Sequence, residues 1–196
     1  PLARSRRSTA PPLAAGCGQF FITTKVAYGR AGGHAAIAAS LHDGVMLPRA
    51  YRRAGLRTDI FDATDTATCR MYETSGEVFA GLAKNATEGI GSPRTIVPFT
   101  LLLAGGQLLP TVLLGLWLAD WPRQAWSAGA AGMVVLAAVL SLVPRLVAAR
   151  QFRQSLGSGL LQPVAIAVFL VIQWYALGRR LLGLKTSWKG RQLAPQ

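Results

Sequence analysis

The chain has 196 residues, of which 51% are hydrophobic and only 15% are charged, and its formal net charge is +13. Soluble domains carry roughly 25% charged residues, so this composition argues against a soluble protein and favours a membrane protein. Nucleic acid is not the expected partner of the positive charge, because the basic residues of the second half lie between apolar runs, where anionic lipid headgroups would meet them.

The first part of the chain contains two stretches with the composition of strands. Residues 1–15 are basic and rich in proline and are expected to be irregular. Residues 17–28, CGQFFITTKVAY, are rich in β-branched and aromatic side chains and predict a buried strand. Residues 56–63, LRTDIFDA, predict a second, shorter strand.

A short helix is expected between the two strands. Leu47, Tyr51 and Ala54 recur at intervals of four and three residues, which is the spacing of one helix face. The helix would follow Asp43 and end at Gly55. The arginines of the segment would face away from that apolar stripe: Arg49, Arg52 and Arg53.

A second helix is expected further along. Thr74 and Glu77 have the spacing of a capping box, in which two side chains bond the free N–H groups of the first helical turn. The helix would run to about Glu88 and end at Gly89. Its apolar residues share one face, which suits a helix lying along a membrane interface and equally a helix packed on a globular core.

From Ile96 onwards the chain becomes strongly apolar. Three runs contain no charged residue: 96–118, 127–143 and 161–178. A transmembrane helix needs about 20 apolar residues, so each run is predicted to form a membrane span. Trp174 and Tyr175 would lie at the membrane–water interface.

The expected orientation contains a conflict. The segment 144–160 is expected to be a loop, and it holds Arg145, Arg150 and Arg153, so the positive-inside rule places it, together with residues 1–95, in the cytoplasm. Three full spans then place the basic tail, residues 179–196, on the other side, against the same rule. Either one run is re-entrant or interfacial, with the Pro- and Gly-interrupted run 96–118 as the first suspect, or the tail is an exception.

Three possible sites in residues 1–95 have little support in the sequence. Cys17, His34, His42 and Cys69 are zinc-ligand types, but no pair has the close spacing of a structural site. The same residues could provide Cys–His nucleophilic catalysis, for which there is no local signature. The glycine-rich segment 29–34 lacks the Lys and Ser/Thr of a phosphate-binding loop, and a turn explains it better.

A fourth pair, Asp43 and Arg70, suits group transfer. An ionised carboxylate can accept a proton, and the guanidinium of an arginine offers a fixed fork of donors for a diphosphate. Transfer of a group from a nucleotide donor to a hydroxyl needs both functions. An exposed aspartate and an ion-paired arginine would be the alternative interpretation.

The order of the motifs along the chain gives further support to Asp43 and Arg70 as a functional pair. The chain contains CGQFFITTKVAYGRAGGH, then LHDGVMLPRAYRRAG, then ATCRMYETSGEVFAGLAKNATEG, then apolar runs and finally WKGR. This order resembles the membrane-bound family 2 glycosyltransferases, and among them the relatives that glycosylate lipids, such as the carotenoid- and hopanoid-type enzymes. The resemblance covers residues 16–118 and the terminal WKGR.

The resemblance implies roles for particular residues. The Cys-Gly strand that lines the donor and acceptor pocket in this family maps onto Cys17, Gly18 and Gln19. The acidic pair with the catalytic base maps onto His42 and Asp43, so Asp43 would be the base. His42 replaces the usual Glu, which removes a second carboxylate; it would position Asp43 or serve only the structure.

The third motif would bind the leaving group. The Gln-x-x-Arg-Trp motif of the family, or its Arg-Met-Tyr variant, maps onto Arg70, Met71 and Tyr72. Arg70 would stabilise the departing diphosphate, and Tyr72 would supply the aromatic surface in place of the missing Trp. The Asp-x-Asp of the family is absent from these residues, so the divalent cation, Mg or Mn, is expected to be held by an upstream half outside them.

The resemblance therefore implies a partial α/β domain of the GT-A type, with residues 1–95 as its C-terminal half, followed by about three transmembrane or interfacial helices within residues 96–178 and a basic tail. The expected activity is inverting transfer of a sugar from a nucleotide-sugar to a lipid or glycan, with residues 1–196 inactive by themselves. The expected location is the bacterial inner membrane, with the catalytic domain cytoplasmic. The alternative is a non-enzymatic membrane protein whose basic domain binds a partner or lipid.

Overall fold

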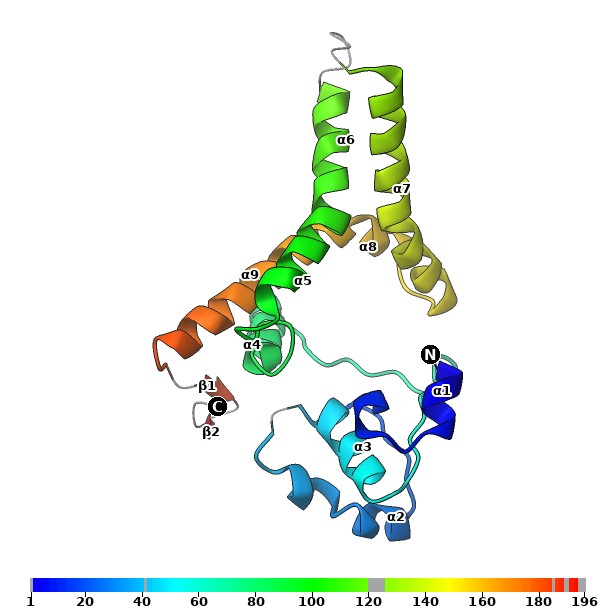
Figure 1. The fold of residues 1–196 in the computed structure, drawn as a ribbon, viewed down its shortest axis with the longest axis vertical. Coiled ribbons are helices and arrows are strands. Elements are labelled where there is room, and N and C mark those ends of the chain that lie inside the picture. The colour runs from blue at the N-terminus through cyan, green and yellow to red at the C-terminus, as the bar shows by residue number, and fades with distance from the viewer. Residues whose placement is uncertain (1, 41, 120–125, 185, 189–190, 194–196) are drawn as a thin grey trace. The chain divides into compact units, whose positions relative to one another are not determined.

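The computed structural model describes residues 2–40, 42–119, 126–184, 186–188 and 191–193. The chain divides into two compact units, Pro1–Val78 and Phe79–Gln196, and helix α4 crosses the boundary between them. Each unit is described by itself (Figure 1).

The first unit contains short helices joined by irregular segments. Their bounds are α1 (Leu2–Arg7), η1 (Pro11–Leu13), α2 (Lys25–Arg30), η2 (Gly33–Ile37), α3 (Asp43–Arg53) and the start of α4 (Ser75–Ala86). A small apolar core lies around α3, where Leu47, Ala50 and Tyr51 pack against Ala31 and Ile37.

The predicted α/β domain is wrong. Within the described part of residues 1–95 there is no strand; the only described sheet is the hairpin of β1 (Thr186–Trp188) and β2 (Arg191–Leu193), near the end of the chain. The predicted strand 17–28 is irregular up to Thr24, whose side chain caps α2 by accepting a hydrogen bond from the Ala27 N–H at 3.2 Å. β-Branched residues favour a strand only where a neighbouring strand pairs with it, and none does here.

The second predicted strand, 56–63, is irregular as well. Asp59 accepts a hydrogen bond from the backbone N–H of Ile60 at 2.8 Å, and Asp62 accepts one from that of Thr64 at 2.9 Å. Such local side-chain bonds occupy backbone donors that a strand would use for pairing. The two aspartates therefore favour turns over an extended ladder.

The two predicted helices of this region are confirmed. Helix α3 runs from Asp43 to Arg53, and Gly55, with φ of +75°, follows it in the left-handed conformation that ends helices. Helix α4 begins after Thr74, whose hydroxyl accepts a hydrogen bond from the Glu77 N–H at 3.2 Å. It ends at Ala86, slightly before the predicted end.

The second unit is built on long apolar helices. Its helices after α4 are α5 (Ile96–Leu103), the π-helical turn η3 (Ala104–Leu108), α6 (Leu109–Ala119), α7 (Ala128–Gln151), α8 (Leu156–Leu160) and α9 (Gln162–Leu181). Helices α6 and α7 pack side by side, and α5 packs against α9 (Figure 1). The Trp174 indole N–H donates to the Thr100 hydroxyl at 3.1 Å, joining α9 to α5.

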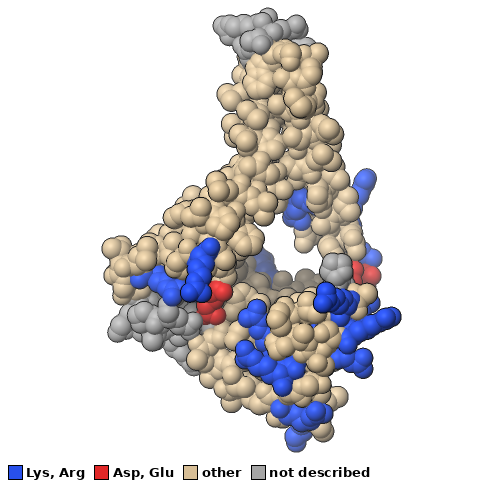
Figure 2. Space-filling model, in the orientation of Figure 1, with Lys and Arg blue, Asp and Glu red and all other residues tan. Residues whose placement is uncertain are grey.

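Three helices are long and apolar enough to cross a membrane: Ile96–Ala119, Ala128–Gln151 and Gln162–Leu181. The predicted spans are thereby confirmed by length and composition. Figure 2 shows no charged side chain on the visible face of α6 and the first half of α7, in agreement with the uncharged sequence there. Side chains such as Leu101 and Leu136 are exposed on the helix surfaces, where lipid would cover them.

Two details of the spans differ from the sequence prediction. The run 96–118 is not interrupted at Gly105 and Gly106; the helix continues through them as the π-helical turn η3. A π-turn absorbs one extra residue without breaking the helix. The segment 144–160 is not a loop, because α7 continues through Pro144 to Gln151 and α8 follows after a short turn.

Candidate functional site

Asp43 is the first residue of α3, and its carboxylate lies at the start of the helix. Its Oδ1 accepts a hydrogen bond from the Gly44 N–H at 2.8 Å. A negative charge is favoured at this end of a helix because the helix dipole is positive there. The side chain is exposed, so a bound molecule could reach the carboxylate.

The segment Cys17–Gln19 crosses directly over the start of α3. A Cβ atom on Gly18 would lie 2.6 Å from Oδ1 of Asp43, which is closer than any real carbon contact. A Cβ on Gly44 would lie 3.1 Å from the Gly18 nitrogen. Gly18 and Gly44 therefore allow residues 17–19 to approach the Asp43 carboxylate. A larger residue at position 18 would displace that carboxylate.

Gln19 connects this segment to the third motif. Its Nε2 donates to the sulfur of Met71 at 2.7 Å, and its Oε1 accepts from the Cys17 thiol at 2.6 Å. Met71 lies between Arg70 and Tyr72, so the predicted Arg-Met-Tyr motif is held next to residues 17–19. Three motifs that are far apart in the sequence thus lie in one chain of contacts.

The base and the arginine of the predicted pair do not touch. Within the described residues, no hydrogen bond or ion pair joins Asp43 to Arg70, and the Arg70 side chain is exposed. Tyr72 is half-buried.

His42 has a structural position at the start of α3. It is the N-cap residue, its backbone N–H donates to the Ser40 hydroxyl at 3.0 Å, and its carbonyl accepts from the Met46 N–H at 2.9 Å. Its side chain makes no capping hydrogen bond. His42 therefore fixes the backbone that carries Asp43.

The structure does not bring together a metal site in the part of the chain it describes. No group of three or more His, Cys, Asp or Glu side chains there could hold a metal ion. The His34 ring instead bonds the Tyr28 hydroxyl at 2.8 Å, and both cysteines are exposed and unpaired by any disulfide. The resemblance places the divalent cation in an upstream half outside these residues, so its presence stays a prediction.

Sequence reasoning missed the role of Arg52, which was expected to face away from the core. Its side chain is 2% exposed, and its guanidinium donates to the carbonyls of Ser5, Ser8, Ala10 and Thr58 and to the hydroxyls of Ser5 and Thr58. These bonds tie the N-terminal segment to α3. A single arginine beside an apolar stripe gives no sequence signal for such burial.

A nearby ion pair also links the N-terminal helix to residue 59. Arg6 Nε lies 3.0 Å from Asp59 Oδ2, with both side chains about half exposed. The hydrogen bond from Arg6, followed by the one from the Ile60 backbone, lowers the pKa of Asp59 below its usual value of 3.8. The pair therefore links α1 to the irregular segment that contains Asp59.

The fold and this cluster define a helical protein with three helices of membrane-spanning length and a small N-terminal unit that carries an exposed carboxylate. Comparison of the chain with family models, with curated proteins and with solved structures finds no match. The glycosyltransferase resemblance consequently depends on its sequence motifs alone and stays a prediction.

Proposed function

We propose that the chain carries the acceptor-side catalytic residues of a membrane-bound glycosyltransferase, which moves a sugar from a nucleotide-sugar to a hydroxyl of a lipid or glycan. One observation carries the proposal. Gly18 packs against Asp43 and Gln19 bonds Met71, so the three motifs named by the resemblance lie in one continuous set of contacts.

Asp43 would act as the general base. Its carboxylate takes the proton of the acceptor hydroxyl while the hydroxyl oxygen attacks the anomeric carbon of the donor sugar. A new carbon–oxygen bond forms on one face of the sugar as the bond to the diphosphate breaks on the other, so the configuration inverts. Exposure of Asp43 at the start of α3 gives the acceptor access to the carboxylate.

Arg70 would stabilise the leaving group. The nucleoside diphosphate departs with the electron pair of the broken bond, and a guanidinium within hydrogen-bond reach offsets the charge that develops on its oxygens. Gly18 and Gln19 are positioning residues in this scheme: the first leaves room for the Asp43 carboxylate, and the second holds the segment that carries Arg70.

The helical structure limits the proposal to these residues. The described part of residues 1–95 contains no α/β sheet, so recognition of the nucleotide is assigned to none of them. The three membrane-length helices would keep the residues at a bilayer, where a lipid acceptor is concentrated.

A second candidate function is a non-enzymatic membrane protein whose N-terminal unit binds a partner or lipid. The absence of a sheet from the described part of that unit favours it. So do apolar side chains left at the surface, such as Ile22 at 71% and Phe61 at 53% exposed.

A transfer assay separates the two candidates. Membranes containing the protein expressed from its native gene are incubated with radiolabelled nucleotide-sugars, and label in the lipid and glycan fractions is measured. Transfer that falls about 100-fold in Arg70→Gln, with Arg57→Gln as an exposed control, supports the proposed enzyme. No transfer from any donor to either fraction favours the second candidate.

A further inference from the structure

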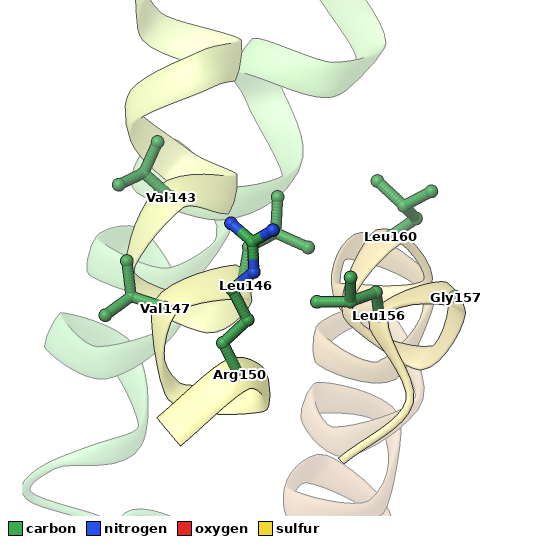
Figure 3. Close-up of a pocket in the computed structure, with 7 residues that line it drawn as sticks. All are labelled: Val143, Leu146, Val147, Arg150, Leu156, Gly157 and Leu160. Carbon is green, nitrogen blue, oxygen red and sulfur yellow. The ribbon is translucent and has the colours of Figure 1, made fainter. Parts of the chain in front are cut away.

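An apolar groove lies between the end of α7 and the short helix α8, far along the chain from the residues discussed above. Its volume is about 360 Å³. It is lined by Val143, Leu146, Val147, Arg150, Leu156, Gly157 and Leu160 (Figure 3). Arg150 is the only charged residue of the lining.

The groove is built by a tight turn that folds α8 back onto α7. The Gln154 N–H donates to the Ala149 carbonyl at 2.7 Å, and Arg153 has a φ of +51°. The two helices come close at Gly159, where a Cβ would lie 2.8 Å from Cδ2 of Leu146. Beside this close approach, the valines and leucines of the two helices form the apolar walls of the groove.

Arg150 brings a positive charge to these walls. In the view of Figure 3 its side chain extends from the last turn of α7 with the guanidinium between α7 and α8. Among the described residues, no hydrogen bond or ion pair involves this guanidinium. The sequence contains no acidic residue after Asp120, so no carboxylate of the following segments could neutralise it.

These features determine the chemistry of an occupant. A hydrocarbon chain fits walls of valine and leucine, and a phosphate group fits a guanidinium at the end of a membrane-length helix. Long basic side chains near the ends of such helices reach toward headgroups at the interface. The volume is at the lower end of ligand pockets, so it suits part of one lipid chain rather than a whole lipid.

We propose that the α7–α8 groove binds one anionic phospholipid, with an acyl chain against Val143, Val147 and Leu156 and the phosphate at Arg150. This site is separate from the proposed sugar transfer and does not depend on it. An anionic lipid held here would stabilise the turn between α7 and α8.

Native mass spectrometry of the detergent-solubilised full chain, titrated with phosphatidylglycerol or with phosphatidylcholine, tests the proposal. We expect one phosphatidylglycerol to bind more tightly than phosphatidylcholine. Arg150→Gln should weaken that binding about fivefold, the effect of one basic residue on an anionic lipid. Arg153→Gln, in the adjacent turn but outside the lining, is the matched control and should leave the affinity within about twofold of the unmodified chain.

A second variant tests the apolar part of the groove with the charge intact. Gly157→Phe fills the groove, and its Cβ would meet only the Ser155 hydroxyl at the ordinary distance of 3.6 Å, so the turn should still form. We expect loss of the bound phosphatidylglycerol. The proposal is wrong if neither Arg150→Gln nor Gly157→Phe weakens binding, if Arg153→Gln weakens it as much as Arg150→Gln, or if inorganic phosphate alone displaces the lipid.

Discussion

Gly18 and Asp43 are in such close contact that a methyl group on residue 18 would lie 2.6 Å from the carboxylate oxygen Oδ1. The contact brings together two motifs separated by more than twenty residues of sequence. It also makes the role of a glycine testable, because the smallest possible side chain is enough to disturb it.

Gly18→Ala should therefore impair transfer while leaving the helices intact. The added methyl group displaces the Asp43 carboxylate, and because this side chain is exposed it can move aside at little cost in stability. We expect a lower kcat with a smaller change in the KM of the donor. Circular dichroism of the purified protein should be unchanged.

Gly29→Ala is the control for that substitution. Gly29 lies in α2, and a Cβ there would meet no atom within 4 Å. Because alanine favours a helix more than glycine does, the variant should keep full transfer activity and slightly higher stability. Normal transfer by Gly18→Ala would show that the contact with Asp43 has no catalytic consequence.

Arg52→Met should destabilise the N-terminal unit strongly. The substitution leaves the part-buried carbonyls of Ser5, Ser8 and Thr58 without their donor, a loss of roughly 1–3 kcal/mol. Arg53→Met, at an exposed position of the same helix, should have little effect. Limited proteolysis measures both, with earlier cleavage within residues 1–60 expected only for Arg52→Met.

The Arg6–Asp59 pair predicts a pH dependence of the same unit. The pKa of Asp59 is lower in the folded chain than its usual value of 3.8, so the folded state binds fewer protons in this range. Its contribution to stability is present above that value and is lost as the pH falls through the folded pKa. Asp59→Asn should remove this part of the acid dependence, measured as the urea midpoint of residues 1–78 against pH.

The effect should be small, since Asp59 is exposed and solvent screens the pair. Arg6→Gln should reduce the acid dependence in the same way, because the hydrogen bond from Arg6 is the largest cause of the lowered pKa. An unchanged pH profile in both variants would mean that the pair does not persist in solution.

The three long helices predict which parts of the chain lie on opposite sides of a membrane. If α7 crosses it, the start and the end of this helix are on different sides. Single cysteines at Ala128 and Gln151, in a background with Cys17 and Cys69 replaced by serine, should react with an impermeant maleimide from opposite sides. Labelling of both from one side would exclude α7 as a span.

The sequence alone was sufficient to predict those elements whose signal lies in neighbouring residues. Uncharged runs predict the three long helices, the Thr74–Glu77 pair predicts the start of α4, and Gly55 predicts the end of α3. These features depend on residues within a turn or two of each other or on the average apolarity of a run, so no tertiary information is needed.

The two predicted strands, 17–28 and 56–63, do not form, because a strand depends on a pairing partner that can lie far away in the sequence. The segment 17–24 has a strand composition, yet no partner strand lies beside it and Thr24 starts a helix instead. Likewise, the burial of Arg52 depends on carbonyls from a distant segment. The positions of Asp43 and Arg70 were predicted as a pair, but the contacts that connect their motifs, through Gly18 and Gln19, are visible only in three dimensions.

The most direct test of the account is the rate of sugar transfer by Asp43→Asn in the native protein. Asparagine keeps the shape of the side chain and removes its ability to take a proton, so the rate should fall by about 10²- to 10⁴-fold with unchanged protein level and membrane insertion. Asp62→Asn, which changes an exposed aspartate in an irregular segment, should transfer normally. Transfer by Asp43→Asn at the unmodified rate would contradict the assignment of Asp43 as the base.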